Sequence, residues 1–75
     1  MTLDKVAMGA LAEVRDFRDL SVADVARLAG LGLRRGSAVT KLLRTPLRDP
    51  VECLVGPQLL TLDSWLLKRI LVEPS

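Results

Sequence analysis

The side chains that could carry out chemistry are few in this 75-residue chain. Cys53 is the single cysteine and histidine is absent, so the commonest general base near neutral pH is missing. One cysteine can form neither an internal disulfide nor a thiolate zinc cluster, and a free cysteine is usually buried. We therefore expect Cys53 to be a core residue, and we predict no catalytic residue, no cofactor and no enzyme activity.

Carboxylates are the remaining candidates for holding a hard cation. Such cations need several oxygen ligands gathered in one short loop or cluster. The aspartates considered are spread along the chain without a dense acidic loop, so capping and solvation explain them better than a defined metal site. These aspartates are Asp16, Asp19, Asp24, Asp49 and Asp63.

The composition points to one small folded domain over residues 1–75. Hydrophobic residues make up 49% of the chain, which is too apolar for a disordered segment, but no apolar run approaches the roughly 20 residues of a membrane span. Residues 1–10 lack the apolar core of a secretory signal, so we expect a cytoplasmic location. The net charge of +2 favours an acidic protein surface as partner, and 3% aromatic content offers no base-stacking platform for nucleic acid.

One helix is predicted in the first half of the chain. Ser21 and Asp24 have the spacing of a capping box, which starts a helix at Ser21. Gly30 or Gly32 can supply the left-handed residue that ends it. Asp63 can cap a further brief helical turn near Trp65, whose side chain is expected either to cover the core or to contact a partner.

Alternating apolar residues and turn signals predict short strands elsewhere. Gly56 and Pro57 form the turn of a hairpin, and two prolines make residues 46–50 an exposed connection. Five strands and one short helix suggest an all-β fold, a small partly open antiparallel barrel whose free edge could pair two copies weakly. The expected strands are 12–17, 37–44, 51–55, 58–62 and 70–73.

Two segments offer a different interpretation. Residues 24–30 and 39–44 resemble the helix-turn-helix of Lac-repressor-type regulators. That motif needs a turn of about three residues between its helices, whereas residues 31–36 intervene here. We therefore rank DNA binding as an unfavoured alternative.

A second resemblance covers nearly the whole chain, residues 9–74. Residues 27–36 (RLAGLGLRRG) resemble the pattern R-L-x-x-L-G-hydrophobic-x-x-G, and residues 46–50 (PLRDP) resemble P-L-G-D-P. Both patterns are similar to those of the FeoA family, small cytoplasmic accessory proteins of bacterial ferrous iron uptake. The resemblance implies an SH3-like barrel similar to the C-terminal domain of iron-dependent repressors. Arg48 replaces the usual glycine, and Leu62-Asp63 replaces a Leu-Arg pair.

The resemblance also implies a partner, the FeoB permease with its cytosolic GTP-binding domain. We expect docking through the turn after the helix, with adjacent arginines steering an acidic surface and a leucine as anchor. Core packing of the leucines, a backbone role for the glycines and ordinary solvation of the arginines are the competing interpretations. The residues concerned are Leu31, Gly32, Leu33, Arg34 and Arg35. A freestanding domain of a metal-dependent transcription regulator is the main alternative, and direct Fe²⁺ carriage ranks third.

Overall fold

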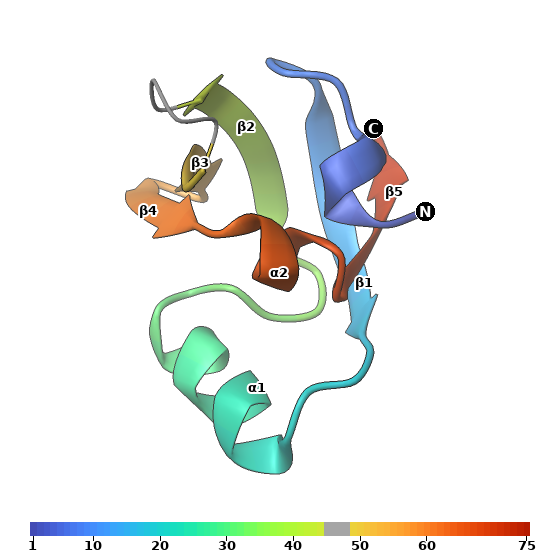
Figure 1. Cartoon of the computed structure of the whole chain (residues 1–75), viewed down its shortest axis with the longest axis vertical. Helices are drawn as coiled ribbons and strands as arrows, with labels where there is room; N and C mark the ends of the chain where they lie inside the picture. Colours follow the sequence, from blue (N-terminus) through green and yellow to red (C-terminus); the bar gives the residue numbers. More distant parts are fainter. Residues whose placement is uncertain (45–48) are drawn as a thin grey trace.

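Five antiparallel strands form a single curled sheet in the computed structural model, which describes residues 1–44 and 49–75. The strand order is β4-β3-β2-β1-β5, so β4 and β5 are the edges (Figure 1). Each predicted strand is confirmed to within one residue at either end. Their bounds are β1 Leu11–Phe17, β2 Ala38–Arg44, β3 Val51–Val55, β4 Gln58–Leu62 and β5 Ile70–Pro74.

The strands alternate between a buried and an exposed face, as their sequences predict. In β3, Val51, Cys53 and Val55 are buried while Leu54 faces outward. The register Val39↔Val55 and Ala12↔Val39 places buried residues of neighbouring strands side by side. One core therefore serves every strand.

Two irregularities bend the sheet. The register shifts between Val14 and Asp16 in the β1–β5 pair, and between Lys41 and Leu43 in the β2–β3 pair. An extra residue on one strand increases local twist and bends that strand. The sheet consequently curls into the partly open barrel expected from the sequence.

Helix α1, Val22–Gly30, projects beyond one end of the sheet (Figure 1). Its start is confirmed, because the Ser21 side chain accepts a hydrogen bond from the Asp24 N–H at 3.0 Å. The Asp24 carboxylate turns instead to Arg27, 3.1 Å away, so only half of a capping box forms. Leu28 is the one buried residue of this helix, so most of the α1 surface is open to solvent.

Helix α2, Ser64–Leu67, connects the two edge strands, β4 and β5. Asp63 caps it as predicted, accepting from the Leu66 N–H at 2.8 Å. Asp49, just before β3, accepts from the Ser64 N–H at 2.7 Å. Leu67 is buried against the core, so this short helix covers the gap between the edges from one side.

An N-terminal segment covers the β5 edge, and the sequence did not predict it. The 3₁₀ helix η1, Leu3–Lys5, buries Leu3 completely. Thr2 forms an isolated bridge with Leu71, and the Val72 N–H donates to the Met1 carbonyl at 2.8 Å. Three helical residues are too few to show a periodic pattern.

The strand at Ala38–Arg44 excludes the helix-turn-helix alternative. That interpretation needs a recognition helix there, but these residues pair with both β1 and β3. The proline-rich connection and the Arg48 departure fall largely on residues 45–48, outside the described residues. Within the described chain, no helix has the length and apolarity needed to cross a membrane.

Candidate docking surface

The candidate surface is the turn that follows α1, residues 31–36, called the docking turn below. Its first half ends the helix with a Schellman arrangement. The Leu33 N–H donates to the Leu28 carbonyl at 2.9 Å, and the Gly32 N–H donates to the Ala29 carbonyl at 3.0 Å. Gly32 has φ +94°, a left-handed conformation that glycine adopts readily. Its backbone role is thereby established.

The two leucines of the docking turn have different environments. Leu33 is fully buried in the same core cluster as Leu28. It therefore anchors the turn to the barrel and cannot be the partner contact expected from the sequence. Leu31 is 43% exposed, so core packing, the competing interpretation, does not hold for this leucine. Of the two leucines, Leu31 is the one whose side chain is accessible at this surface.

The second half of the docking turn is tied to β1. The Gly36 N–H donates to the Val14 carbonyl at 2.8 Å, and the Val14 N–H donates to the Ser37 carbonyl at 2.9 Å. The Ser37 hydroxyl donates to the Gly32 carbonyl at 2.7 Å and accepts from the Arg34 N–H at 3.0 Å. These bonds hold the turn in one conformation.

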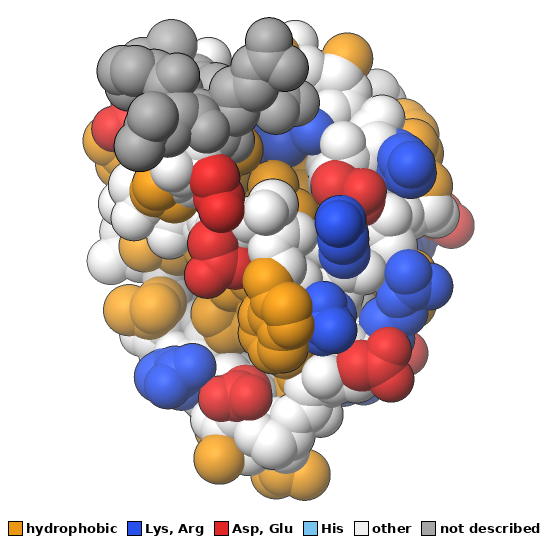
Figure 2. Space-filling view, viewed as in Figure 1, with side chains coloured by type: hydrophobic (Ala, Val, Ile, Leu, Met, Phe, Trp, Pro, Cys, Tyr) orange, Lys and Arg blue, Asp and Glu red, His pale blue; other side chains and the backbone are white. Residues whose placement is uncertain are grey.

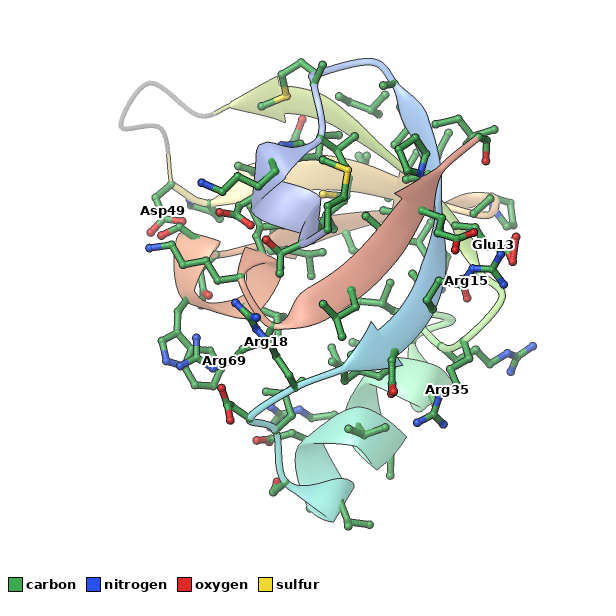
Figure 3. All side chains as sticks on the ribbon, turned by 90° about the vertical axis from the view of Figure 1, so that its right-hand side faces the viewer. Glu13, Arg15, Arg18, Arg35, Asp49 and Arg69 are labelled. Carbon is green, nitrogen blue, oxygen red and sulfur yellow. The ribbon has the colours of Figure 1, made fainter. Side chains whose placement is uncertain are left out.

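The adjacent arginines are not equivalent. Arg35 pairs with Asp16 at 2.7 Å, and Figure 3 shows Arg35 beside the lower part of β1. The pKa of Asp16 is lowered, first by the Phe17 backbone N–H that donates to its carboxylate and then by the Arg35 guanidinium. Arg34 has no carboxylate partner among the described residues. Arg34 is therefore the cation that remains available to an acidic partner.

An open groove of about 290 Å³ lies beside Arg34. One wall is formed by Gly32 and Arg34 of the docking turn together with Ser37, and the other is the β3–β4 hairpin over residues 55–58. The Gln58 side chain lies close enough to Gly32 that a Cβ there would stand 3.4 Å from its Oε1. The docking turn is thus packed against the beginning of β4.

A second exposed patch surrounds Trp65 on α2. The ring is 53% exposed, and the Arg69 guanidinium stacks over it at 3.9 Å from the centroid. Figure 2 shows an apolar patch at the centre of this face with basic side chains to one side, and Figure 3 places Arg18 near Arg69. Trp65 and Arg69 are four residues apart, a spacing at which side chains meet on a helical turn.

The interior carries a lysine whose burial was not predicted from the sequence. Lys41 is only 2% exposed, and its Nζ donates to the Asp4 carbonyl at 3.2 Å. Its register partner Cys53 is buried, as expected, and burial raises the pKa of this thiol to about 11 although Lys41 opposes the shift. Alternation with buried Val39 was the available signal that Lys41 points inward. Such a thiol remains protonated and is a poor nucleophile at neutral pH.

No group of three or more Cys, Asp or Glu that could hold a metal occurs within residues 1–44 and 49–75. Four of the five aspartates considered as cation ligands are engaged separately: Asp24 with Arg27, Asp16 with Arg35, and Asp49 and Asp63 with α2. What the described surface offers is a rigid turn with an apolar side chain and a free cation. The curled five-stranded sheet that carries this turn is a small SH3-like barrel.

The comparisons with known proteins identify the family. The family model described as the FeoA domain matches residues 1–74. The chain belongs to the FeoA family of ferrous iron transport accessory proteins. Among curated protein sequences, none matched the chain.

Solved structures agree with this assignment. The FeoA protein of Chlorobium tepidum is 34% identical, with a TM-score of 0.89, and the match covers 99% of this chain and 70% of that one. The zinc-complexed FeoA of Stenotrophomonas maltophilia, described as a procaryotic SH3 domain protein, is 29% identical over 97% of this chain and 89% of that one, with a TM-score of 0.79. Both share the barrel.

Two further similarities differ in extent. The iron(II) transport protein A of Clostridium thermocellum is 26% identical with a TM-score of 0.85, and the match covers 99% of this chain but 45% of that chain. This chain therefore spans less than half of that relative. A manganese-dependent transcriptional repressor is 17% identical with a TM-score of 0.81, covering 100% of this chain and 41% of the repressor, which shows a shared fold alone.

Proposed function

We propose that the chain is a cytoplasmic accessory protein that docks through residues 31–36 onto the cytosolic GTP-binding domain of a FeoB-type ferrous iron permease. Family membership supports a role in this transport system. The S. maltophilia relative is described as a candidate activating factor for bacterial ferrous iron transport. Docking from the aqueous side requires no insertion into the membrane.

The observation that carries this proposal is that one hydrogen-bonded turn presents both an exposed leucine, Leu31, and an arginine, Arg34. Leu31 exposes an apolar side chain, and the Arg34 guanidinium has no carboxylate partner within the described chain. Arginine is enriched at interface hot spots, and a turn that is already ordered loses little entropy on binding. A partner with an acidic surface around an apolar pocket fits this arrangement.

Binding of the full chain to the soluble GTP-binding domain of FeoB tests the proposal. We expect Arg34→Glu combined with Arg35→Glu to weaken binding at least about tenfold, because the contact made by Arg34 becomes repulsive and a second negative charge is added beside it. Leu31→Ala should weaken binding by raising the dissociation rate, with little change in the association rate. Surface plasmon resonance at two salt concentrations separates the two effects.

A matched control has the same change of net charge elsewhere. Lys5 and Lys68 are both exposed and lie outside the docking turn. Lys5→Glu combined with Lys68→Glu should leave binding within about twofold of the original chain. If this control and the arginine variant weaken binding equally, the docking turn is not the contact surface.

A further inference from the structure

Strand β4 leaves one edge of the sheet open. It pairs with β3 over its whole length, Val51↔Leu62 to Val55↔Gln58. No other described residue forms a hydrogen bond with the backbone of residues 58–62. Unpaired N–H and C=O groups along such an edge are a template for a further strand.

The hairpin geometry identifies which groups face outward. Gly56 and Pro57 form a two-residue loop, so the closing pair Val55 and Gln58 is a hydrogen-bonded pair. Hydrogen-bonded and non-hydrogen-bonded pairs then alternate along an antiparallel ladder. Gln58, Leu60 and Leu62 therefore bond to β3, whereas Leu59 and Thr61 direct their N–H and C=O groups away from the sheet.

The β4 strand carries none of the usual protection against pairing. Its sequence, Gln-Leu-Leu-Thr-Leu, contains no charged residue and no proline, and Leu59 is 58% exposed. Natural edge strands normally carry a lysine, a proline or a bulge at such places. An edge strand without such protection is able to pair with a further strand.

We propose that β4 pairs with β4 of a second copy of this chain, antiparallel, about a twofold axis at Leu60. In that register Leu59 faces Thr61 of the second copy, and Thr61 faces its Leu59. Each of these is a pair of residues whose backbone groups face outward, so four inter-chain hydrogen bonds form. Leu60 meets Leu60 of the second copy between them.

Charge complementarity at the ends of this register favours a second copy over an unrelated strand. Pro57 lies opposite Asp63 of the second copy, and proline ends the pairing there because it has no N–H. Arg34 lines the groove beside Pro57 and Gln58. Since paired strands lie about 4.8 Å apart, Asp63 of the second copy comes within reach of the long Arg34 side chain. The twofold axis repeats this contact at the other end.

The interface is small, which sets the expected strength. One pair of five-residue strands falls at or below the lower limit of stable protein interfaces. The association is therefore weak, with a monomer–dimer equilibrium in the range of about 10 μM to 1 mM.

Sedimentation equilibrium and NMR of the full chain over a concentration series test this inference. We expect the dimer fraction to rise with concentration, and the amide signals of Leu59 and Thr61 to shift together with it. Thr61→Pro removes an outward N–H without breaking a bond to β3, so the fold should persist while the dimer weakens at least about tenfold. The variant keeps Leu31 and Arg34 of the docking turn and releases Arg34 from the second copy, so FeoB binding should persist in it while the dimer is lost.

Matched leucine variants locate the contact. Leu54 and Leu59 are register neighbours on the outer face, but only Leu59 belongs to the edge. Leu59→Lys should weaken the dimer and Leu54→Lys should not. Asp63→Asn keeps a competent helix cap and should weaken the dimer a few-fold by removing the charge that meets Arg34.

Three results would overturn the inference: a chain that stays monomeric at millimolar concentration, a dimer that survives Thr61→Pro, or equal weakening by Leu54→Lys and Leu59→Lys. The first would leave the β4 edge to a strand of another protein. The last two would place the contact on the outer face or elsewhere.

Discussion

The two edge strands of the sheet differ in how far the rest of the chain covers them. At β5, Met1 accepts a hydrogen bond from Val72, Thr2 bridges to Leu71, and Leu3 fills the core beneath. At β4, the described residues provide no comparable cover, and an apolar side chain, Leu59, remains exposed. One edge is closed within the chain, and the other is available for intermolecular pairing.

This difference shows that in an open barrel one edge can contribute to the stability of the fold while the other remains available for binding. Covering β5 adds buried apolar surface, including Leu3, Val6 and Val72, which a domain of this size needs. Leaving β4 uncovered costs little, because its outward backbone groups remain hydrated. The docking turn lies beside the open edge, because Gly32 and Arg34 line the same groove as Gln58 of β4.

The largest effect is expected from opening the covered edge. Leu3→Ala removes a fully buried side chain and should lower the free energy of unfolding by about 2–5 kcal/mol. Urea denaturation measures the loss, and hydrogen exchange at the Val72 amide should accelerate because its acceptor, Met1, is no longer held. Leu11→Ala, at a site 49% exposed, should change stability by less than about 0.5 kcal/mol. Equal losses would mean that the N-terminal segment does not cover β5.

Two proline variants should show which backbone N–H groups of β4 bond to β3 and which face away from the sheet. Leu60→Pro removes an N–H that bonds to Cys53 in β3 and leaves its acceptor unpaired, which should cost about 2–3 kcal/mol. Thr61→Pro should cost less than about 1 kcal/mol, since that N–H faces solvent. Thermal unfolding at low concentration, where the chain is monomeric, provides the comparison. A reversed order would show that the assigned pairing is offset by one residue.

Gly32, which faces the start of β4 from the docking turn, is a position where a side chain would strain the backbone. Gly32→Ala forces a side chain into φ +94°, which should cost about 1–2 kcal/mol. The new Cβ would meet only the mobile tip of Gln58, so backbone strain dominates. Gly30→Ala, in the helix with open space around it, should be neutral or stabilising by up to about 1 kcal/mol. Opposite signs in urea denaturation confirm the Schellman geometry.

The smallest effect concerns the bulge where β1 meets the covered edge. Asp16 follows the register shift there, and its pKa is lowered by the Phe17 N–H and by Arg35. A lowered carboxyl pKa stabilises the fold above the unfolded-state pKa, and this contribution is lost as pH falls through the folded-state value.

Arg35→Gln should therefore move the Asp16 pKa partway back toward its usual value, since the Phe17 contact, the larger cause, remains. NMR titration of the Asp16 carboxyl carbon measures the shift. Arg27→Gln, which affects a different carboxylate, serves as control and should leave Asp16 unchanged. No movement in the Arg35 variant would mean that this ion pair does not form in solution.

Local signals account for what the sequence predicted well. Alternating residues in β3, the Gly56-Pro57 turn and the Ser21 and Asp63 caps each act within a few residues, and all were confirmed. The long-range arrangements were not accessible. The burial of Leu3 and the Arg35–Asp16 pair depend on how distant segments meet, which no local pattern encodes.

The docking turn shows the limit most clearly. Leu31 and Leu33 are the same residue type two positions apart, so composition alone could not separate them. The separation follows from the six-residue ring that the Leu33 N–H closes onto Leu28, which turns one leucine inward and the other outward. Trp65 was likewise undecided until its stacking with Arg69 and its exposure were known.

The partnership of β1 with β5 has a consequence for how the chain matures on the ribosome. Strands β1 to β4 follow one another as neighbours, whereas β5 must return across the molecule, so that Glu13 meets Glu73 in the register. A nascent chain that has released only β1 to β4 therefore exposes both flanks of its sheet. Emergence of β5 completes the barrel, and until then the growing polypeptide is most vulnerable to wrong associations and to proteases.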